Sequence, residues 1–366
     1  MTFTMGPTAS SETRRDELAG RLMGAALGAL DLQAVYLGDR LGLYQALADG
    51  GPATPTELAE RAGIHPRYAR EWLEHQAVGG ILEVDDVAAG EDDRRYSLPD
   101  GHAAVLIDPD SAWLVAPVSR FLVGTASTMP AVLDAYRTGK GVDWANYGSD
   151  VVEAQEALNR PQFVNYVDDW IGALPDVAQR LRAGDGRIAD VACGTGWSSI
   201  SMARAFPRVR VDGIDIDAGS IERAKGNAER EGLDDRVSFL FADAANADGA
   251  GRYDLVTIFE ALHDMAQPAH VLDTARKLLK PGGAVLIADE RVAETFTAPG
   301  DEAERLFYGY SVVGCLPNGM FDQPSVGTGT VLRPVAMEAI ARMAGFSGFT
   351  VLPTKHDSFR FYRLDP

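Results

Sequence analysis

The chain has 366 residues, of which 46% are hydrophobic and 24% charged, and its formal net charge is −19. This length fits two domains of ordinary size, and the composition is typical of soluble globular proteins. So acidic a chain repels phosphate backbones and anionic lipid headgroups, so we expect no nucleic acid and no membrane among its partners. The start of the chain lacks a signal-peptide pattern, and its two cysteines form no CxxC pair, which favours a reducing cytoplasm.

The first hundred residues predict a small helical domain with a ribbon. Residues 1–16 are polar and lack periodicity, which indicates a loose, disordered tail, and helical apolar spacing then runs from residue 18 to about 48. Thr54 and Pro55 open a short helix that Gly63 ends, and a second helix spans about 65–78. Short strands follow near 81–84 and 95–98. This order is a winged-helix outline, which we assign to residues 17–108.

Two regions follow this domain. Residues 109–183 read as a mostly helical connector and pocket lid, with turns at Pro130, at 139–141 and at Pro161. In residues 184–366 short apolar strands alternate with helices, which predicts an α/β domain whose parallel sheet is covered on both faces. The expected strands are 187–192, 209–215, 237–241, 253–259 and 284–289, with a closing antiparallel pair at 349–352 and 359–364.

A glycine-rich turn between the first strand and its helix is the strongest motif of the chain. It reads Asp190-Val191-Ala192-Cys193-Gly194-Thr195-Gly196, and glycines let the backbone approach a ligand closely. Asp215 ends the next strand, where a carboxylate can accept hydrogen bonds from both ribose hydroxyls. Asp243 follows the third strand and could accept from an adenine amino group, or could simply cap a turn. Together these residues predict a site for an adenosine-bearing molecule.

The same turn argues against a dinucleotide. The dinucleotide fingerprint has a third glycine, and Ser199 stands at that position. This difference weakens the hypothesis that the protein is a nicotinamide-dependent oxidoreductase. Asp190 could also be a buried carboxylate that organises the loop, and Cys193 is expected to be a small packed residue.

These motifs resemble the class I S-adenosylmethionine-dependent methyltransferases, in which Asp190, Gly194 and Gly196 match the glycine-rich motif and Ala192 replaces a usual glycine. The resemblance implies a Rossmann-like, mostly parallel seven-stranded sheet whose last strand is antiparallel. It also implies S-adenosyl-L-methionine as cofactor, S-adenosyl-L-homocysteine as product, and no metal. The implied cofactor contacts are Asp190, Ala192, Gly194, Gly196, Asp215, Ile216, Asp243, Ala244, Phe259 and Glu260.

The whole chain is similar to small-molecule O-methyltransferases of the plant type, and more narrowly to an actinobacterial group of them. The segments that carry this similarity are 159–163, 260–265, 289–292, 315–317 and 359–362. The resemblance implies a small-molecule methyl acceptor, a role in secondary metabolism and a homodimer formed through the N-terminal domain.

Methylation of an oxygen usually requires a base to remove its proton. His263, just beyond the fourth strand, resembles the catalytic histidine of that group, and Glu290, at the end of the fifth, resembles the acid that orients it. Phe163, Tyr166 and Trp170 lie on one helical face and are expected to bind the substrate together with Tyr308, although core packing explains the three equally well. A second pair, His356-Asp357, lies in the closing hairpin, where a structural role is expected.

Other functions stay open at this point. N- or C-methylation would fit the same fold. A metal would have His263 and Asp264 as ligands, but residues 308–311 contain no histidine for a third, so none is expected. A DNA-binding regulator is disfavoured because residues 31–100 hold 14 acidic and 6 basic side chains, and the expected recognition helix has no basic excess.

Overall fold

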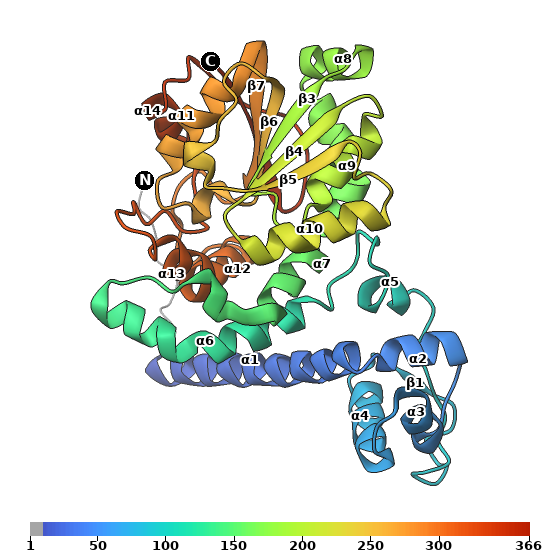
Figure 1. Cartoon of the computed structure of the whole chain (residues 1–366). Coiled ribbons are helices and arrows are strands. Elements are labelled where there is room, and N and C mark those ends of the chain that lie inside the picture. Colours follow the sequence, from blue (N-terminus) through green and yellow to red (C-terminus); the bar gives the residue numbers. More distant parts are fainter. Residues whose placement is uncertain (1–9) are drawn as a thin grey trace, which may run out of the picture. The chain divides into compact units, whose positions relative to one another are not determined.

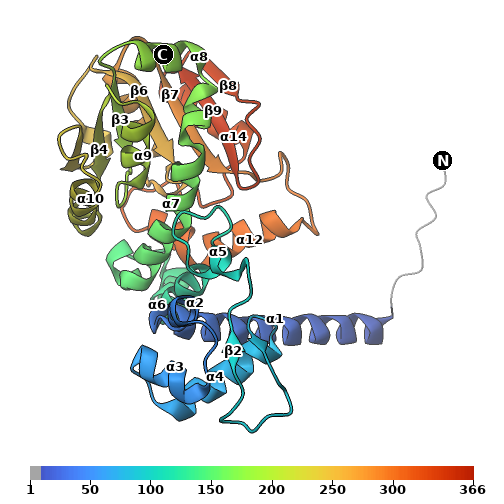
Figure 2. The same cartoon turned by 90° about the vertical axis from the view of Figure 1, so that its right-hand side faces the viewer.

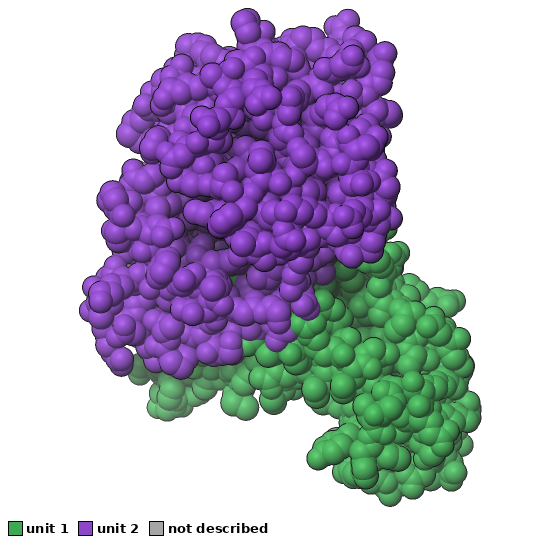
Figure 3. Space-filling model, in the orientation of Figure 1, with its two compact units in different colours: residues 1–123 green, residues 124–366 purple. Residues whose placement is uncertain are grey.

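The structure is a computed structural model that describes residues 10–366 (Figure 1 and Figure 2). It divides into two compact units, residues 1–123 and 124–366 (Figure 3). The boundary falls inside the region predicted as the connector. The part of the predicted tail that covers residues 1–9 lies outside the described residues.

The first unit contains the predicted winged-helix elements. Its helices pack around Tyr44 and Trp72, whose rings meet edge to face at 5.1 Å, and its two short strands pair antiparallel. A capping box begins α3, because the Thr54 hydroxyl accepts from the Glu57 N–H while the Glu57 carboxylate accepts from the Thr54 N–H. The elements are α1 (Ser11–Arg40), α2 (Leu43–Gly50), α3 (Pro55–Ala62), α4 (Pro66–Val78), β1 (Glu83–Val84), β2 (Tyr96–Ser97) and α5 (His102–Leu106).

Two expectations for this unit are wrong. Residues 11–16 belong to α1 rather than to a loose tail: the Ser10 hydroxyl accepts from the Thr13 N–H, and Glu12 lies in the first turn, both of which stabilise a helix start. The polar sequence did not predict the start of this helix, because the first half of the helix is exposed on every side. The predicted helix over 18–48 is two helices, broken at Gly42, which has the left-handed φ of +65°.

Two long helices that run through their prolines follow in the chain, and the first of them crosses the boundary between the units. Pro130 lies inside α6 (Val118–Thr138) and Pro161 inside α7 (Gly148–Gly172), so the turns predicted there are wrong. Each proline loses one backbone hydrogen bond, but its fixed φ is compatible with a helix. The turn at 139–141 is confirmed. The other helices are η1 (Trp144–Tyr147), α8 (Pro175–Ala183), α9 (Trp197–Ala205), α10 (Ala218–Arg230), η2 (Ala244–Asn246), η3 (Leu262–Asp264), α11 (Pro268–Leu278), α12 (Glu302–Tyr310), η4 (Ser311–Cys315), α13 (Leu316–Gly319) and α14 (Pro334–Met343).

A seven-stranded sheet forms the centre of this unit, in the order β5-β4-β3-β6-β7-β9-β8. The strands β3 to β7 are parallel, and β9 lies between β7 and the edge strand β8, antiparallel to both. The predicted sheet is therefore confirmed, including its antiparallel last strand. Its strands are β3 (Arg187–Val191), β4 (Arg210–Asp215), β5 (Val237–Phe241), β6 (Tyr253–Phe259), β7 (Leu279–Glu290), β8 (Gly348–Val351) and β9 (Phe359–Asp365).

Two hydrophobic cores cover the two faces of the sheet. Ile188 of β3 packs with the core that includes α7, α8 and α9, while its neighbours Ala189 and Val191 pack with the core that includes α11 and α14 (Figure 1). Because β3 to β7 are parallel, their carboxyl ends lie together at one edge, where ligands of open α/β sheets bind. None of the helices in residues 10–366 is long and apolar enough to cross a membrane.

Candidate active site

The turn after β3 has a strained backbone. Ala192, Gly194 and Gly196 have φ values of +56°, +52° and +85°, a region that favours glycine. A Cβ on Gly196 would lie 2.6 Å from the ring of Phe239, whereas a Cβ on Gly194 would meet nothing within 4 Å. The turn is therefore packed tightly below Gly196 and is open at Gly194, where a ligand can approach the backbone.

Asp190 organises this turn from below. Its side chain is 1% exposed, and it accepts hydrogen bonds from Ser198, Ser199 and Thr257 at 2.5, 2.6 and 2.8 Å. Burial raises the pKa of Asp190, although these three hydroxyls stabilise its charged form. Ser199, which departs from the dinucleotide fingerprint, thus stabilises the turn by donating its hydroxyl to Asp190.

Asp215 connects the turn to the second strand. One carboxylate oxygen accepts from the Gly194 N–H and the other from the Asp217 N–H, both at 2.8 Å. Burial raises the pKa of Asp215. Because each carboxylate oxygen can accept two hydrogen bonds, Asp215 keeps the capacity to accept from ribose hydroxyls, and that contact stays a prediction.

The other expected cofactor contacts differ in exposure. Ile216 is 63% exposed, and Asp243 caps η2 through the N–H of Ala245 and the side chain of Asn246, with Ala244 beside it. The cap that the sequence offered as the alternative for Asp243 is therefore present, and its contact with adenine stays a prediction.

Phe259 and Glu260 end β6 at the same edge. Glu260 has a φ of +52°, and Gln155 of α7 donates to its carboxylate at 3.5 Å. Burial raises the pKa of Glu260 to about 7. Phe259 is buried against Phe163 and Trp170, with ring centres 5.8 and 5.5 Å away.

His263 lies at the centre of a buried acidic cluster. Its Nδ1 is 3.0 Å from Asp289 Oδ1 and 3.0 Å from Glu290 Oε2, and its Nε2 is 3.5 Å from Asp264 Oδ1. The expected neighbour Glu290 is therefore present, and Asp289 and Asp264 join it. Burial lowers the pKa of His263, but the carboxylates of Glu290, Asp264 and Asp289 outweigh it and raise this pKa well above its usual value.

The two carboxyl groups beside Nδ1 have pKa shifts of opposite direction, although His263 lowers the pKa of both. Burial raises the pKa of Glu290 well above its usual value. The pKa of Asp289 is lowered despite burial, because His263 lies beside it and donates to it. The buried atoms Asp264 Oδ1, Asp289 Oδ2 and Glu290 Oε2 have no hydrogen-bond partner among the described residues.

Cys315 adds a thiol to this cluster. His263, Asp264 and Cys315 place one donor atom each within 4.8 Å of one another, and so do His263, Asp289 and Glu290. The expectation of no metal rested on a missing third ligand near residues 308–311, and Cys315 supplies that donor from η4.

The predicted substrate-binding aromatic residues differ in how exposed they are. Trp170 is only 2% exposed and packs against Phe361 at 5.1 Å, so it belongs to the core rather than to a pocket wall. Phe163 is also buried, while Tyr166 is half-buried. Tyr308 lies on α12, is 38% exposed, and accepts from Arg333 at 3.4 Å.

His356 has the structural role expected of it. Its ring stacks on Phe359 at 4.7 Å, its Nδ1 accepts from the N–H groups of Ser358 and Phe359, and its Nε2 lies 3.1 Å from Gln162 Oε1. Cys193 is buried, as expected, and burial raises the pKa of its thiol.

Known families match both parts of the chain. Residues 183–311 match a family described as "Methyltransferase domain", and residues 28–107 match an "Rv2258c-like winged HTH domain". Among curated proteins, the 27-O-demethylrifamycin SV methyltransferase of Amycolatopsis mediterranei is 37% identical over 169 residues, which cover 46% of this chain and 58% of the relative. A ubiquinone biosynthesis O-methyltransferase of Ralstonia nicotianae is 31% identical over 48% of this chain and 67% of its own length.

Solved structures match nearly the whole chain. The mitomycin 7-O-methyltransferase MmcR has a TM-score of 0.67 at 22% identity, covering 97% of this chain and 99% of that one. Human N-acetylserotonin methyltransferase in complex with SAM has a TM-score of 0.64 at 20% identity, covering 99% of both chains. At these identities the likeness concerns the fold. From the matched domains and the relative matched over two thirds of its length, we conclude that this chain belongs to the S-adenosylmethionine-dependent methyltransferases with an N-terminal winged-helix domain.

Proposed function

We propose that this protein transfers a methyl group from S-adenosyl-L-methionine to a small molecule, most simply to an oxygen atom. The observation that carries the proposal is the link from Asp215 to the Gly194 N–H at 2.8 Å, which joins an open glycine turn to a carboxylate with free acceptor capacity. Asp215 would hold the ribose, while Gly194 would allow close approach of the ligand. When bound, the cofactor supplies a methyl group attached to a sulfonium sulfur. The substrate takes this methyl group directly, so the reaction needs no nucleophile from the protein.

The protein's own contribution to this reaction is proton transfer. The His263 Nδ1 is hydrogen-bonded to Asp289 and lies 3.0 Å from Glu290, so Nε2, which lies 3.5 Å from Asp264, is the nitrogen that would accept a proton from the substrate hydroxyl. The carboxylates stabilise the imidazolium that forms. Because they also raise the pKa of His263 above its usual value, turnover should rise with pH until the imidazole is neutral.

Binding and turnover test this proposal separately. We expect calorimetry to show binding of S-adenosyl-L-homocysteine to the full chain, and Asp215→Ala to lose most of it, since two ribose hydroxyls lose their acceptor. Methyl-labelled cofactor incubated with panels of small phenols, carboxylic acids and amines identifies the acceptor. His263→Gln should lower turnover about 10²–10⁴-fold and leave this binding in place. Unchanged binding in Asp215→Ala would contradict the cofactor assignment.

The proposed partner, besides the methyl acceptor, is a second copy of the chain that contacts α1. Four apolar side chains that are 49–71% exposed recur along this helix at four-, three- and seven-residue steps, which place them on one side: Met23, Leu27, Leu30 and Leu37. A 30-residue helix is about 45 Å long, enough for a continuous helical seam. Light scattering should give the mass of a dimer, which Leu27→Glu dissociates and the control Gln33→Glu, an exposed polar position on α1, leaves intact.

The winged helix supports a protein partner rather than DNA. The two arginines of α4, both in its first half, are paired with acids, Arg67 with Glu71 at 2.5 Å and Arg70 with Glu91 at 2.5 Å. A helix that binds phosphates needs unneutralised basic residues.

A further inference from the structure

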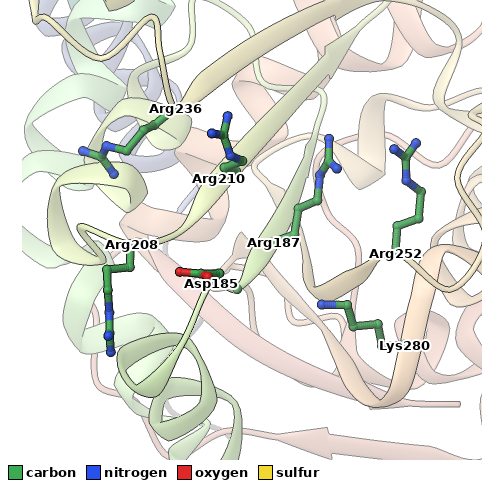
Figure 4. A pocket seen from close by; sticks show the side chains of 8 residues that line it. Asp185, Arg187, Arg208, Arg210, Arg236, Arg252 and Lys280 are labelled. Carbon is green, nitrogen blue, oxygen red and sulfur yellow. The ribbon is translucent and has the colours of Figure 1, made fainter.

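The second unit has a basic cavity of about 580 Å³ in which six of the eight lining residues are cations (Figure 4). They are Arg187, Arg208, Arg210, Arg236, Arg252 and Lys280. The chain has only 34 basic residues and a net charge of −19, so this concentration of positive charge runs against the field of the whole molecule.

The cavity lies at the amino ends of the parallel strands. Arg187 and Arg210 are the first residues of β3 and β4 and pair in register, while Arg236 and Arg252 directly precede β5 and β6. The glycine turn follows the opposite end of β3, about 16 Å away along a strand of five residues, and Asp215 is the last residue of β4. The basic cavity is therefore separate from the candidate active site.

Two of the cations are paired with acids. Arg187 binds Asp212 at 2.7 Å, and Lys280 binds Asp254 at 2.7 Å. Both acids belong to strands of the sheet.

The remaining arginines keep their charge. Arg208, Arg210 and Arg236 donate to backbone carbonyl oxygens at 2.8, 3.1 and 2.8 Å, which fixes their positions without neutralising them. The Arg252 side chain has no hydrogen bond or ion pair within residues 10–366. Only one acid, Asp185, lines the cavity itself.

We propose that this cavity binds a small molecule that carries a di- or triphosphate group. Guanidinium groups match phosphate oxygens with paired hydrogen bonds, and several of them compensate more than one negative charge. The volume of the cavity lies within the range of small-molecule sites. A folded protein domain is far too large to enter it. Asp185, next to the arginines, can accept from a hydroxyl of the same ligand.

Inorganic pyrophosphate and tripolyphosphate test the proposal on the full chain by calorimetry at low salt. We expect one site per chain, tighter binding of tripolyphosphate than of pyrophosphate, and weaker binding as salt is added. Arg210→Gln and Arg252→Gln should each weaken binding about tenfold, because each removes a charge-assisted hydrogen bond. Arg305→Gln, an exposed arginine of α12 outside the cavity, is the matched control.

The variants also separate binding from folding. Their melting temperatures should equal that of the parent chain, because Arg252 has no side-chain partner and Arg210 bonds a single carbonyl. Equal weakening in Arg305→Gln, or no binding of either phosphate at millimolar concentration, would overturn the proposal. Binding of a polyglutamate peptide but of neither phosphate would also overturn it and would make the cavity a contact for an acidic protein segment. None of these readouts requires methyl transfer.

Discussion

Replacement of His263 by glutamine should destabilise the second unit as well as lower turnover. The imidazole is 2% exposed and lies 3.0 Å from both Asp289 and Glu290, which are themselves buried. Glutamine retains a polar side chain but removes the positive charge that these carboxylates share.

The size of the effect follows from the burial. Loss of one partner of a buried ion pair costs about 3–5 kcal/mol, because the other charge is left uncompensated. Here the pKa of Glu290 is already raised, so this carboxyl can take up a proton and limit the loss to about 3 kcal/mol. For a domain of this size, that corresponds to a decrease in melting temperature of roughly 6–12 °C.

Calorimetric melting of His263→Gln, Glu290→Gln and the double variant measures the coupling. Glu290→Gln should cost less than His263→Gln, because the ion pair with Asp289 remains. The double variant should be less destabilised than the sum of the two single variants, since its cluster has one fewer unpaired carboxylate. A melting temperature of His263→Gln equal to that of the parent chain, or strictly additive losses, would refute the reasoning.

Three other results are expected. Gly196→Ala should destabilise the chain by about 2–4 kcal/mol in denaturant titrations, because its φ is +85° and its Cβ would approach Phe239; an unchanged midpoint would count against the strained turn. Melting temperature should fall as pH rises, because the folded chain raises the pKa of Glu260 from 4.5 to about 7 and that of His263 above 6.5. Both groups stabilise the fold through the protons that they bind. This contribution is complete at pH values below the pKa of the unfolded chain and is lost as pH rises through the pKa of the folded chain. A pH-independent melting temperature between 5 and 9 would contradict these shifts. Trp170→Ala should cost about 3–5 kcal/mol of unfolding free energy, as expected of a core residue, and a change confined to substrate KM would restore it to the pocket.

Local patterns in the sequence predicted most of the second unit. Alternating apolar runs identified every strand of the sheet, and the glycines after β3 identified the turn because few other residues adopt its backbone angles. The turns predicted at Pro130 and Pro161 were wrong. Proline breaks helices in most contexts, but tertiary packing keeps α6 and α7 continuous here. The sequence also gave no sign that Ala192 adopts a positive φ.

The acidic cluster was only partly predictable. Glu290 was found because it ends a strand and resembles the acidic residue that orients the histidine in plant-type O-methyltransferases. Asp289 precedes it on the same strand, and alternation predicts that neighbouring side chains point to opposite faces, so the shared contact with Nδ1 could not be foreseen. Cys315 lies 52 positions after His263 in a short π-helical segment, and no spacing rule connects the two.

The parallel strands separate charge along their own direction. Carboxyl groups concentrate at the carboxyl ends of β6 and β7, and arginines concentrate at the amino ends of β3 to β6. The second unit is thus electrically polar, and a positively charged sulfonium approaching from solvent would be drawn to one end while a polyanion would be drawn to the other. Capture rates of the two kinds of molecule should therefore respond independently to surface mutations at opposite ends of the same sheet.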